Sequence, residues 1–193
     1  MRKTCKSRIE FGDYQTLNRL AIDICQNLED LGMRPKAVVE PTCGIGSFVI
    51  EACDAFPITE IVYGFEINRT HLKTLQNKIK ETVNEKKVQL QGADFFTIDW
   101  RKTLPKVSGS VLVVGNFPWV TNSLQGTING KNLPEKSNFQ GHNEFDAISG
   151  KANFDISECM LLEVLSWFSH RNACHSALFK IQAAGRRFDK CNA

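Results

Sequence analysis

Four polar side chains in this sequence each stand directly after a short apolar run. They are Glu40, Glu66, Asp94 and Asn116. A single acid or amide in such a place commonly caps an element or forms a turn, so one of them alone says little. If the apolar runs are parallel strands, however, their carboxyl ends share one edge of the sheet, where open α/β sheets bind ligands. The four together therefore predict a ligand site.

The turn after the first of these runs contains two glycines, Gly44 and Gly46. Glycine lacks a Cβ atom, so a ligand can approach the backbone closely and the chain can adopt a positive φ. A dinucleotide-binding turn needs a third glycine, and Val49 occupies that position. Glu66 can accept hydrogen bonds from ribose hydroxyls, and Asp94 can accept one from an adenine amino group. The pattern favours an adenosine ligand without pyrophosphate.

Residues 116–119, with the sequence NFPW, have the groups needed to handle an amino group. The Asn116 side-chain oxygen and the Phe117 backbone carbonyl can accept two hydrogen bonds from one NH2 group, which makes its nitrogen more nucleophilic. Pro118 stiffens the turn. Trp119 offers a flat surface on which an extruded base can stack, a contribution of about 1–3 kcal/mol. The alternative is an ordinary strand-to-loop turn with a core tryptophan.

Apolar runs that read as strands alternate with segments of helical periodicity, and this order predicts the fold. The predicted strands are 37–39, 61–65, 88–90 and 111–114, and residues 176–181 are a candidate for a fifth. The predicted helices are 14–31, 48–52, a helix capped by Asn68 with the apolar face Leu72, Leu75, Ile79 and Val83, and a helix from a capping box at 155–158 to Phe168. We therefore predict an α/β fold, a Rossmann-like open parallel sheet with helices on both faces.

The composition fits one globular domain. Of the 193 residues 42% are hydrophobic and 23% charged, and the net charge of +3 neither requires nor excludes a nucleic acid partner. The cysteine count, seven, is odd and no pair has C-x-x-C spacing, so we expect reduced thiols, a cytoplasmic location and no metal site. Neither a membrane-spanning stretch nor a secretory signal is evident.

These motifs resemble those of the class I S-adenosylmethionine-dependent methyltransferases, specifically the adenine-N6 DNA methyltransferases of restriction-modification systems. Residues 40–48, EPTCGIGSF, resemble the cofactor loop D/E-P-x-C-G-x-G-x-F of that family. Residues 116–119 resemble its catalytic motif N/D-P-P-Y/F/W, and residues 11–16, FGDYQT, resemble the segment that precedes its cofactor loop. The resemblance covers about residues 10–181.

The resemblance implies S-adenosylmethionine as the cofactor and a role for each matching residue. The methionine moiety would lie against Tyr14, Gln15 and Thr16. The cofactor loop would comprise Glu40, Pro41, Thr42, Cys43, Gly44 and Gly46. Beyond the loop, Glu66 would hold the ribose, Asp94 would bind the adenine amino group, and Ile67 or Phe95 would flank the adenine ring. An adenine flipped out of double-stranded DNA would be held by Asn116, Phe117, Pro118 and Trp119.

The sequence departs from the family pattern in two ways. Phe117 stands where the family has its first proline, so the turn loses one fixed φ. After Ile181 there is room neither for the hairpin that usually ends the family sheet nor for a DNA-recognition domain, so C-terminal strands are expected to be missing. The expected organisation is an N-terminal helical segment that completes the cofactor pocket (1–35), a catalytic core (36–181) with a substrate-side loop (120–154), and an irregular tail (182–193).

The function expected from these features is site-specific methylation of adenine N6 in DNA, with a specificity or endonuclease subunit as a candidate partner. Two alternatives stay open. Related enzymes methylate RNA bases or protein glutamine side chains, and a truncated chain of this family can be a non-catalytic remnant. A nicotinamide dehydrogenase is disfavoured by Val49 at the third glycine position.

Overall fold

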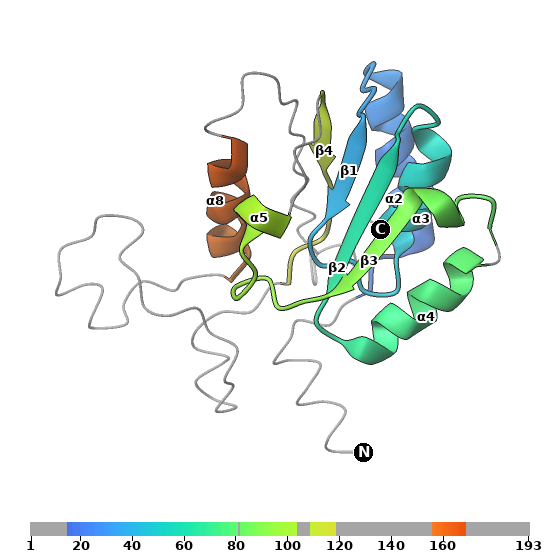
Figure 1. Ribbon diagram of the computed structural model, residues 1–193. Coiled ribbons are helices and arrows are strands. Elements are labelled where there is room, and N and C mark those ends of the chain that lie inside the picture. The colour runs from blue at the N-terminus through green and yellow to red at the C-terminus, as the bar shows by residue number, and fades with distance from the viewer. Residues whose placement is uncertain (1–14, 81, 104–108, 119–155, 169–193) are drawn as a thin grey trace, which may run out of the picture.

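The computed structural model describes residues 15–80, 82–103, 109–118 and 156–168. Within them, four parallel strands form one sheet in the order β3-β2-β1-β4 (Figure 1). The strands are β1 (Ala37–Glu40), β2 (Ile61–Glu66), β3 (Val88–Gly92) and β4 (Val111–Val113). In β1, Val39 pairs with Tyr63 of β2 on one side and with Val113 of β4 on the other. The predicted open parallel sheet is confirmed.

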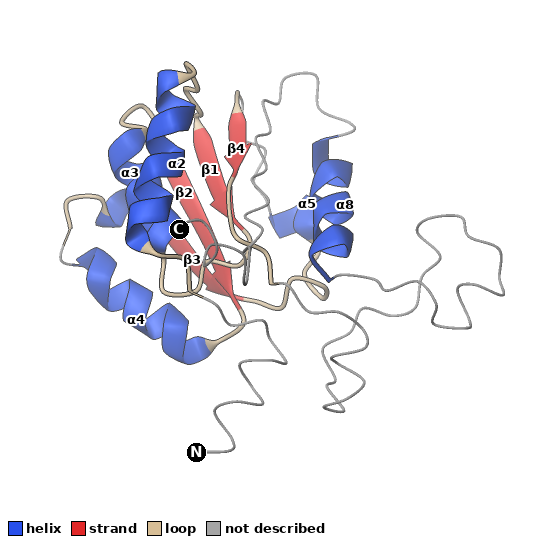
Figure 2. Cartoon of the chain, turned by 180° about the vertical axis from the view of Figure 1, so that it is seen from behind, coloured by secondary structure: helices blue, strands red, loops and turns tan. Residues whose placement is uncertain are grey.

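Helices cover both faces of this sheet, as predicted (Figures 1 and 2). One face carries α2 (Asn18–Asp30), α3 (Ser47–Ala55) and α4 (Arg69–Lys80). The other face carries the short α5 (Trp100–Thr103) and α8 (Ile156–Phe168). A single 3-10 turn, Glu85–Lys87, leads into β3.

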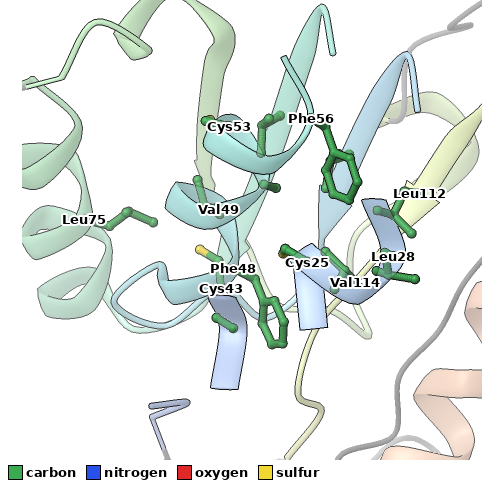
Figure 3. Packing of buried hydrophobic residues seen from close by; sticks show 14 of the residues in the cluster. Cys25, Leu28, Cys43, Phe48, Val49, Cys53, Phe56, Leu75, Leu112 and Val114 are labelled. Carbon is green, nitrogen blue, oxygen red and sulfur yellow. The ribbon is translucent and has the colours of Figure 1, made fainter. Parts of the chain in front are cut away.

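The strand residues divide between two hydrophobic clusters because successive side chains of a strand point to opposite faces. Val38, Val62 and Leu112 face α2, α3 and α4. They pack there with Cys25, Phe48 and Phe56, several of which Figure 3 shows as sticks. In the part of the chain that the structure describes, the buried cysteines Cys25, Cys43 and Cys53 are free thiols. Burial raises the pKa of Cys25 to about 12 and that of Cys53 to about 11, so both stay protonated.

The second face is closed by aromatic rings. The Phe95 and Trp100 ring centroids lie 5.1 Å apart, and the Trp100 and Trp167 centroids lie 4.5 Å apart. The buried Trp100 Nε1 donates a hydrogen bond to the Phe95 carbonyl at 2.9 Å, so its polar atom is satisfied. These contacts connect α8 to the segment after β3.

The helices form where the sequence predicts them, but two of them are shorter than predicted. The predicted helix 14–31 forms as Asn18–Asp30, and the Asn68 side chain caps α4 by accepting a hydrogen bond from the Thr70 N–H at 2.9 Å. Val83, expected on the apolar face of α4, is 98% exposed, because the helix ends at Lys80. That prediction was wrong.

Several expected segments cannot be placed on this fold. The strand at 176–181, the loop at 120–154 and the tail at 182–193 lie outside the described residues. Among the helices that are described, none combines the length and the apolar character needed to cross a membrane.

Candidate active site

The strand order puts a topological switch point between β1 and β4. From β1 the chain passes to β2 and then β3 on one side, and it returns to pair β4 with the other side of β1. Open α/β sheets bind their ligands beyond the carboxyl ends of the strands at such a point. The loop at 42–46 follows β1 and Asn116 follows β4, so the two motifs extend from neighbouring strands.

The backbone N–H groups of the loop at 43–46 are all used within the protein. In order, they donate to the Phe65 carbonyl at 2.8 Å, the Glu66 carboxylate at 2.8 Å, the Gln15 side chain at 2.9 Å and the Cys43 carbonyl at 2.8 Å. A loop that cradles phosphate presents unpaired N–H groups to the anion. This loop therefore has no such cradle, in agreement with Val49 at the third glycine position.

The two glycines of the loop are required by its shape. Gly44 has a φ of +54° and Gly46 a φ of +88°, a region that side chains with a Cβ rarely adopt. A Cβ at Gly44 would collide with the Gln15 side chain, and one at Gly46 would collide with Leu75. Larger residues are thus disfavoured at both positions, because of the positive φ and because a Cβ atom would collide with a neighbouring side chain.

Glu66 links the loop to the start of α4. One carboxylate oxygen accepts from the Gly44 N–H at 2.8 Å, and the other accepts from the Asn68 N–H at 2.7 Å. Each carboxylate oxygen has two acceptor sites, so both keep capacity for a further donor. Glu66 is therefore held in place and can still accept hydrogen bonds from a ligand.

Three buried side-chain oxygens at the switch point lack a hydrogen-bond partner among the described residues. They are Glu40 Oε2, Thr42 Oγ1 and Asn116 Oδ1. Leaving a buried polar atom without a partner costs about 1–3 kcal/mol, so folded proteins rarely do so without a reason. Three acceptors of this kind, all on predicted site residues, indicate a place where a ligand supplies donors.

Glu40 is the most deeply buried of these groups, with 3% of its surface exposed. Burial raises the pKa of its carboxyl well above the usual 4.5, a backbone hydrogen bond with Val49 opposes the rise, and the nearby charge of Glu66 adds to it. A cationic ligand group beside Glu40 would favour the charged carboxylate and lower that pKa again.

The turn after β4 packs against the start of the loop after β1. A Cβ at Gly115 would lie 3.6 Å from Glu40 Cγ and 3.8 Å from Pro41 Cδ, which are ordinary contacts. The Phe117 side chain is buried, and its ring centroid lies 6.2 Å from that of Phe95. Packing of the phenylalanine thus anchors the turn at the position where the family has proline.

The remaining predicted site residues differ in their burial and contacts, and two of them lie outside the described residues. Asp94 Oδ1 accepts a hydrogen bond from the Phe96 N–H at 3.0 Å. Phe95 is buried in the aromatic cluster, whereas Ile67 is 43% exposed and has more surface available to flank a ligand. The Thr16 carbonyl accepts from the Ser47 hydroxyl at 2.8 Å, which holds the segment before α2 against α3. Tyr14 and Trp119 lie outside the described residues.

Two contacts at the loop had no signal in the sequence. The Ser47 hydroxyl lies 2.9 Å from the Asn18 side-chain oxygen, and Lys78 Nζ donates to the Ile45 carbonyl at 3.1 Å. Both join residues about thirty positions apart through single side chains. No periodicity or motif spacing marks such pairs.

The sheet order, the glycine turn after β1 and the asparagine turn after β4 define the class I methyltransferase architecture. No family model matches the sequence. The chain is 42% identical over 178 residues to the Type II methyltransferase M.NspV of Nostoc sp. (strain ATCC 29411 / PCC 7524), which covers 91% of this chain and 36% of that protein. Over most of its length the chain is thus similar to a Type II methyltransferase, and it spans about a third of the length of this relative.

Solved structures resemble the chain more weakly. A provisionally assigned RNA methyltransferase from Pyrococcus horikoshii is 17% identical with a TM-score of 0.45, over 57% of this chain and 50% of that one. An RNA methyltransferase from Salinibacter ruber in complex with S-adenosyl-L-homocysteine is 19% identical with a TM-score of 0.39, over 52% of this chain and 60% of that one. Similarities of this size carry no weight on substrate.

Proposed function

We propose that the chain is the catalytic core of an S-adenosylmethionine-dependent methyltransferase that methylates the N6 amino group of adenine in DNA, within a restriction-modification system. The observation that carries the proposal is a set of three buried acceptors at the switch point, on Glu40, Thr42 and Asn116, that have no partner in the part of the chain that the structure describes. The family relationship supports the reaction type, while the substrate rests on the motifs.

The residues present fit S-adenosylmethionine as the cofactor. It combines an adenosine with two cationic groups and has no phosphate, and the site offers acceptors while its loop N–H groups are already paired. Glu40 and Thr42 would accept from the methionine end, and Glu66 and Asp94 from the adenosine. When bound, the cofactor supplies an electrophilic methyl group.

The chain itself would act by positioning the amino group that receives the methyl. Asn116 Oδ1 is buried and has no partner among the described residues, so it is available to accept one N–H of that group. The Phe117 carbonyl would accept the other N–H, because the buried Phe117 ring fixes the turn. Two acceptors in a fixed arrangement hold the nitrogen for in-line attack, and orientation of this kind supplies a large part of catalysis.

DNA is the substrate that we favour over RNA and protein. Cofactor loops with the full P-x-C-G-x-G-x-F pattern, preceded by a segment like FGDYQT, are typical of the DNA enzymes. A duplex adenine would have to be flipped out of the helix to reach Asn116, at a cost of a few kcal/mol. RNA or glutamine methylation and a cofactor-binding remnant without turnover are the competing outcomes.

A transfer assay with tritium-labelled S-adenosylmethionine separates these outcomes. The protein is incubated in parallel with unmethylated plasmid DNA, total RNA and protein extract, and labelled DNA is digested for nucleoside mass spectrometry. We expect label in DNA only, recovered as N6-methyladenine. Label confined to RNA or protein overturns the substrate. Cofactor binding without any transfer overturns the catalytic role, and absence of binding overturns the cofactor assignment.

A further inference from the structure

The backbone of one residue of the cofactor loop, Ile45, is held at its N–H and at its carbonyl by side chains that lie outside the loop. The Ile45 N–H donates to Gln15 Oε1 at 2.9 Å, and the Ile45 carbonyl accepts from Lys78 Nζ at 3.1 Å. Gln15 precedes α2, and Lys78 belongs to the last turn of α4. The two bonds therefore fix the middle of the loop to two separate elements.

The backbone of Ile45 needs external support because this residue lies between two glycines. Gly44 and Gly46 both adopt positive φ, with values of +54° and +88°. Glycine can leave such a conformation at little steric cost, so the glycines permit the loop shape without enforcing it. The hydrogen bonds from Gln15 and Lys78 to the Ile45 backbone restrict the loop to one of the conformations that the glycines allow.

Helix α4 meets the loop along one stripe of side chains. His71, Leu75 and Lys78 are spaced by four and three residues, which places them on the same helix face. Leu75 fills the space beside Gly46, and His71 Nδ1 lies 3.4 Å from the Gln15 amide nitrogen. One rigid helix thus contacts both the loop and the side chain that holds the loop from the other side.

We propose that Lys78 is a positioning residue for the cofactor loop: it fixes the Ile45 carbonyl while Gln15 holds the Ile45 N–H, and it so sets the affinity for S-adenosylmethionine. The inference rests on the proposed function, since it takes the loop as the cofactor site. Lys78 acts through the Ile45 carbonyl and not by attracting the cofactor, because the lysine ammonium and the sulfonium are both cations.

Lys80 provides a matched control for the possibility that Lys78 only stabilises helix α4. A lysine near the C-terminus of a helix interacts favourably with the helix dipole, and Lys80 shares that position in the last turn of α4. Lys80 is exposed. Substitution of either lysine by methionine removes the same charge from the same turn, and only Lys78→Met removes the bond to Ile45.

The first measurement is amide hydrogen exchange of residues 44–46 in the full chain without cofactor. We expect Lys78→Met to speed exchange at Ile45 about tenfold, because the bond that it removes involves a charged donor. Lys80→Met should leave exchange unchanged, and Lys78→Arg should retain slow exchange. If Lys78→Met fails to fold, Lys78→Gln replaces it in the comparison with Lys78→Arg. Equal exchange in the Lys78 and Lys80 variants would overturn the proposal.

The second measurement is calorimetric titration with S-adenosylmethionine, followed by transfer kinetics. Lys78→Met should raise the Kd about tenfold and leave kcat at saturating cofactor unchanged, with Lys80→Met equal to the unsubstituted chain. A lowered kcat with unchanged Kd would overturn the positioning role. If the unsubstituted chain binds no cofactor, the proposed function fails, whereas altered exchange in Lys78→Met alone would still support control of the loop by Lys78.

Discussion

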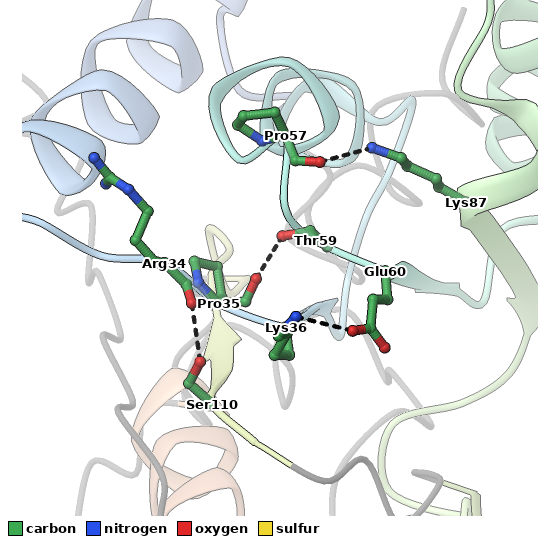
Figure 4. Close-up of polar contacts among 8 residues, drawn as sticks. All are labelled: Arg34, Pro35, Lys36, Pro57, Thr59, Glu60, Lys87 and Ser110. Atoms are coloured by element: carbon green, nitrogen blue, oxygen red, sulfur yellow. Dashed lines mark hydrogen bonds and ion pairs between the residues drawn. The ribbon is translucent and has the colours of Figure 1, made fainter.

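The polar groups at the two ends of the β-sheet differ in whether they have hydrogen-bond partners within the protein. At the amino ends of the strands, which Figure 4 shows, polar groups find protein partners. The buried Thr59 hydroxyl donates to the Pro35 carbonyl at 2.8 Å, and Ser110 donates to the Arg34 carbonyl at 3.0 Å. Lys36 pairs with Glu60 at 3.0 Å. This end is completed by the chain itself.

At the carboxyl ends, the buried oxygens of Glu40, Thr42 and Asn116 have no partner within the described part of the chain. Two threonines make the contrast direct, since the Thr59 hydroxyl is satisfied while the Thr42 hydroxyl is buried and unpaired. Each unpaired group costs about 1–3 kcal/mol of stability. The comparison indicates that polar side chains at the amino ends of the strands stabilise the fold. Those at the carboxyl ends are available to bind a ligand.

The largest effect that we predict from this contrast is on catalysis at the end of β4. Asn116→Ala should lower the transfer rate by about 100- to 1000-fold, because it removes a preorganised acceptor for the amino group. Cofactor binding should persist. Ser110→Ala, at the other end of the same strand, is the matched control and should keep its activity. The tritium-transfer assay measures both, and equal activity in the two variants would contradict the assignment of Asn116.

The second prediction concerns two glycines with nearly the same positive φ. Gly32, after α2, has a φ of +84°, and a Cβ there would meet no described atom within 4 Å, whereas a Cβ at Gly46 would meet Leu75. Gly32→Ala should cost about 1–2 kcal/mol from conformation alone. Gly46→Ala should cost about 1–3 kcal/mol more from overpacking and should abolish cofactor binding. Urea unfolding gives both values, and equal losses would mean that the loop yields to the extra methyl group.

The sequence predicts the strands well, because their apolar runs are short, rich in valine and isoleucine, and end at polar residues or glycine. The runs at 37–39, 61–65 and 111–114 form strands at these positions to within one residue. The polar residues after them reach one edge because parallel strands share their direction. The position of the ligand site at the carboxyl ends of the strands can therefore be predicted from the sequence pattern alone.

Other parts of the site depend on contacts that no local pattern encodes. Helix α5 has four residues, too few to show periodicity, yet its Trp100 joins the ring cluster that buries Phe95 and Phe117. The Lys78 bond to Ile45 is likewise a tertiary contact. Val83 continues the apolar spacing of α4, but the helix ends before it, and periodicity cannot mark where a helix stops.

A third prediction uses the pH dependence of Glu40. Its pKa is raised in the folded protein by burial, so the folded state binds this proton more tightly than the unfolded state does. This contribution to stability is present at low pH and is lost as pH rises above 4.5 through the folded-state value. Glu40→Gln should therefore stabilise the cofactor-free protein at pH 8, have little effect at pH 4, and weaken cofactor binding.

Glu60→Gln is the control for that change, because Glu60 is an exposed ion-pair partner at the amino end of the sheet. Loss of an exposed pair should alter the free energy of unfolding by less than about 1 kcal/mol at either pH. Thermal unfolding at the two pH values measures both variants. A Glu40→Gln protein that is destabilised at pH 8 would show that the contacts of the carboxylate, such as its hydrogen bond with the Val49 backbone, outweigh the cost of burying it.

The smallest predicted effect compares the two threonines. Thr59→Val should lower the free energy of unfolding by about 1–2 kcal/mol, because the Pro35 carbonyl loses its donor. Thr42→Val should change stability by less than about 0.5 kcal/mol or increase it, because the hydroxyl that it removes is buried and unpaired. Calorimetric titration should show the reverse order, with cofactor binding weakened by Thr42→Val alone. A stability loss from Thr42→Val equal to that from Thr59→Val would remove the contrast between the two ends, because it would mean that the protein already satisfies the hydroxyl reserved here for a ligand.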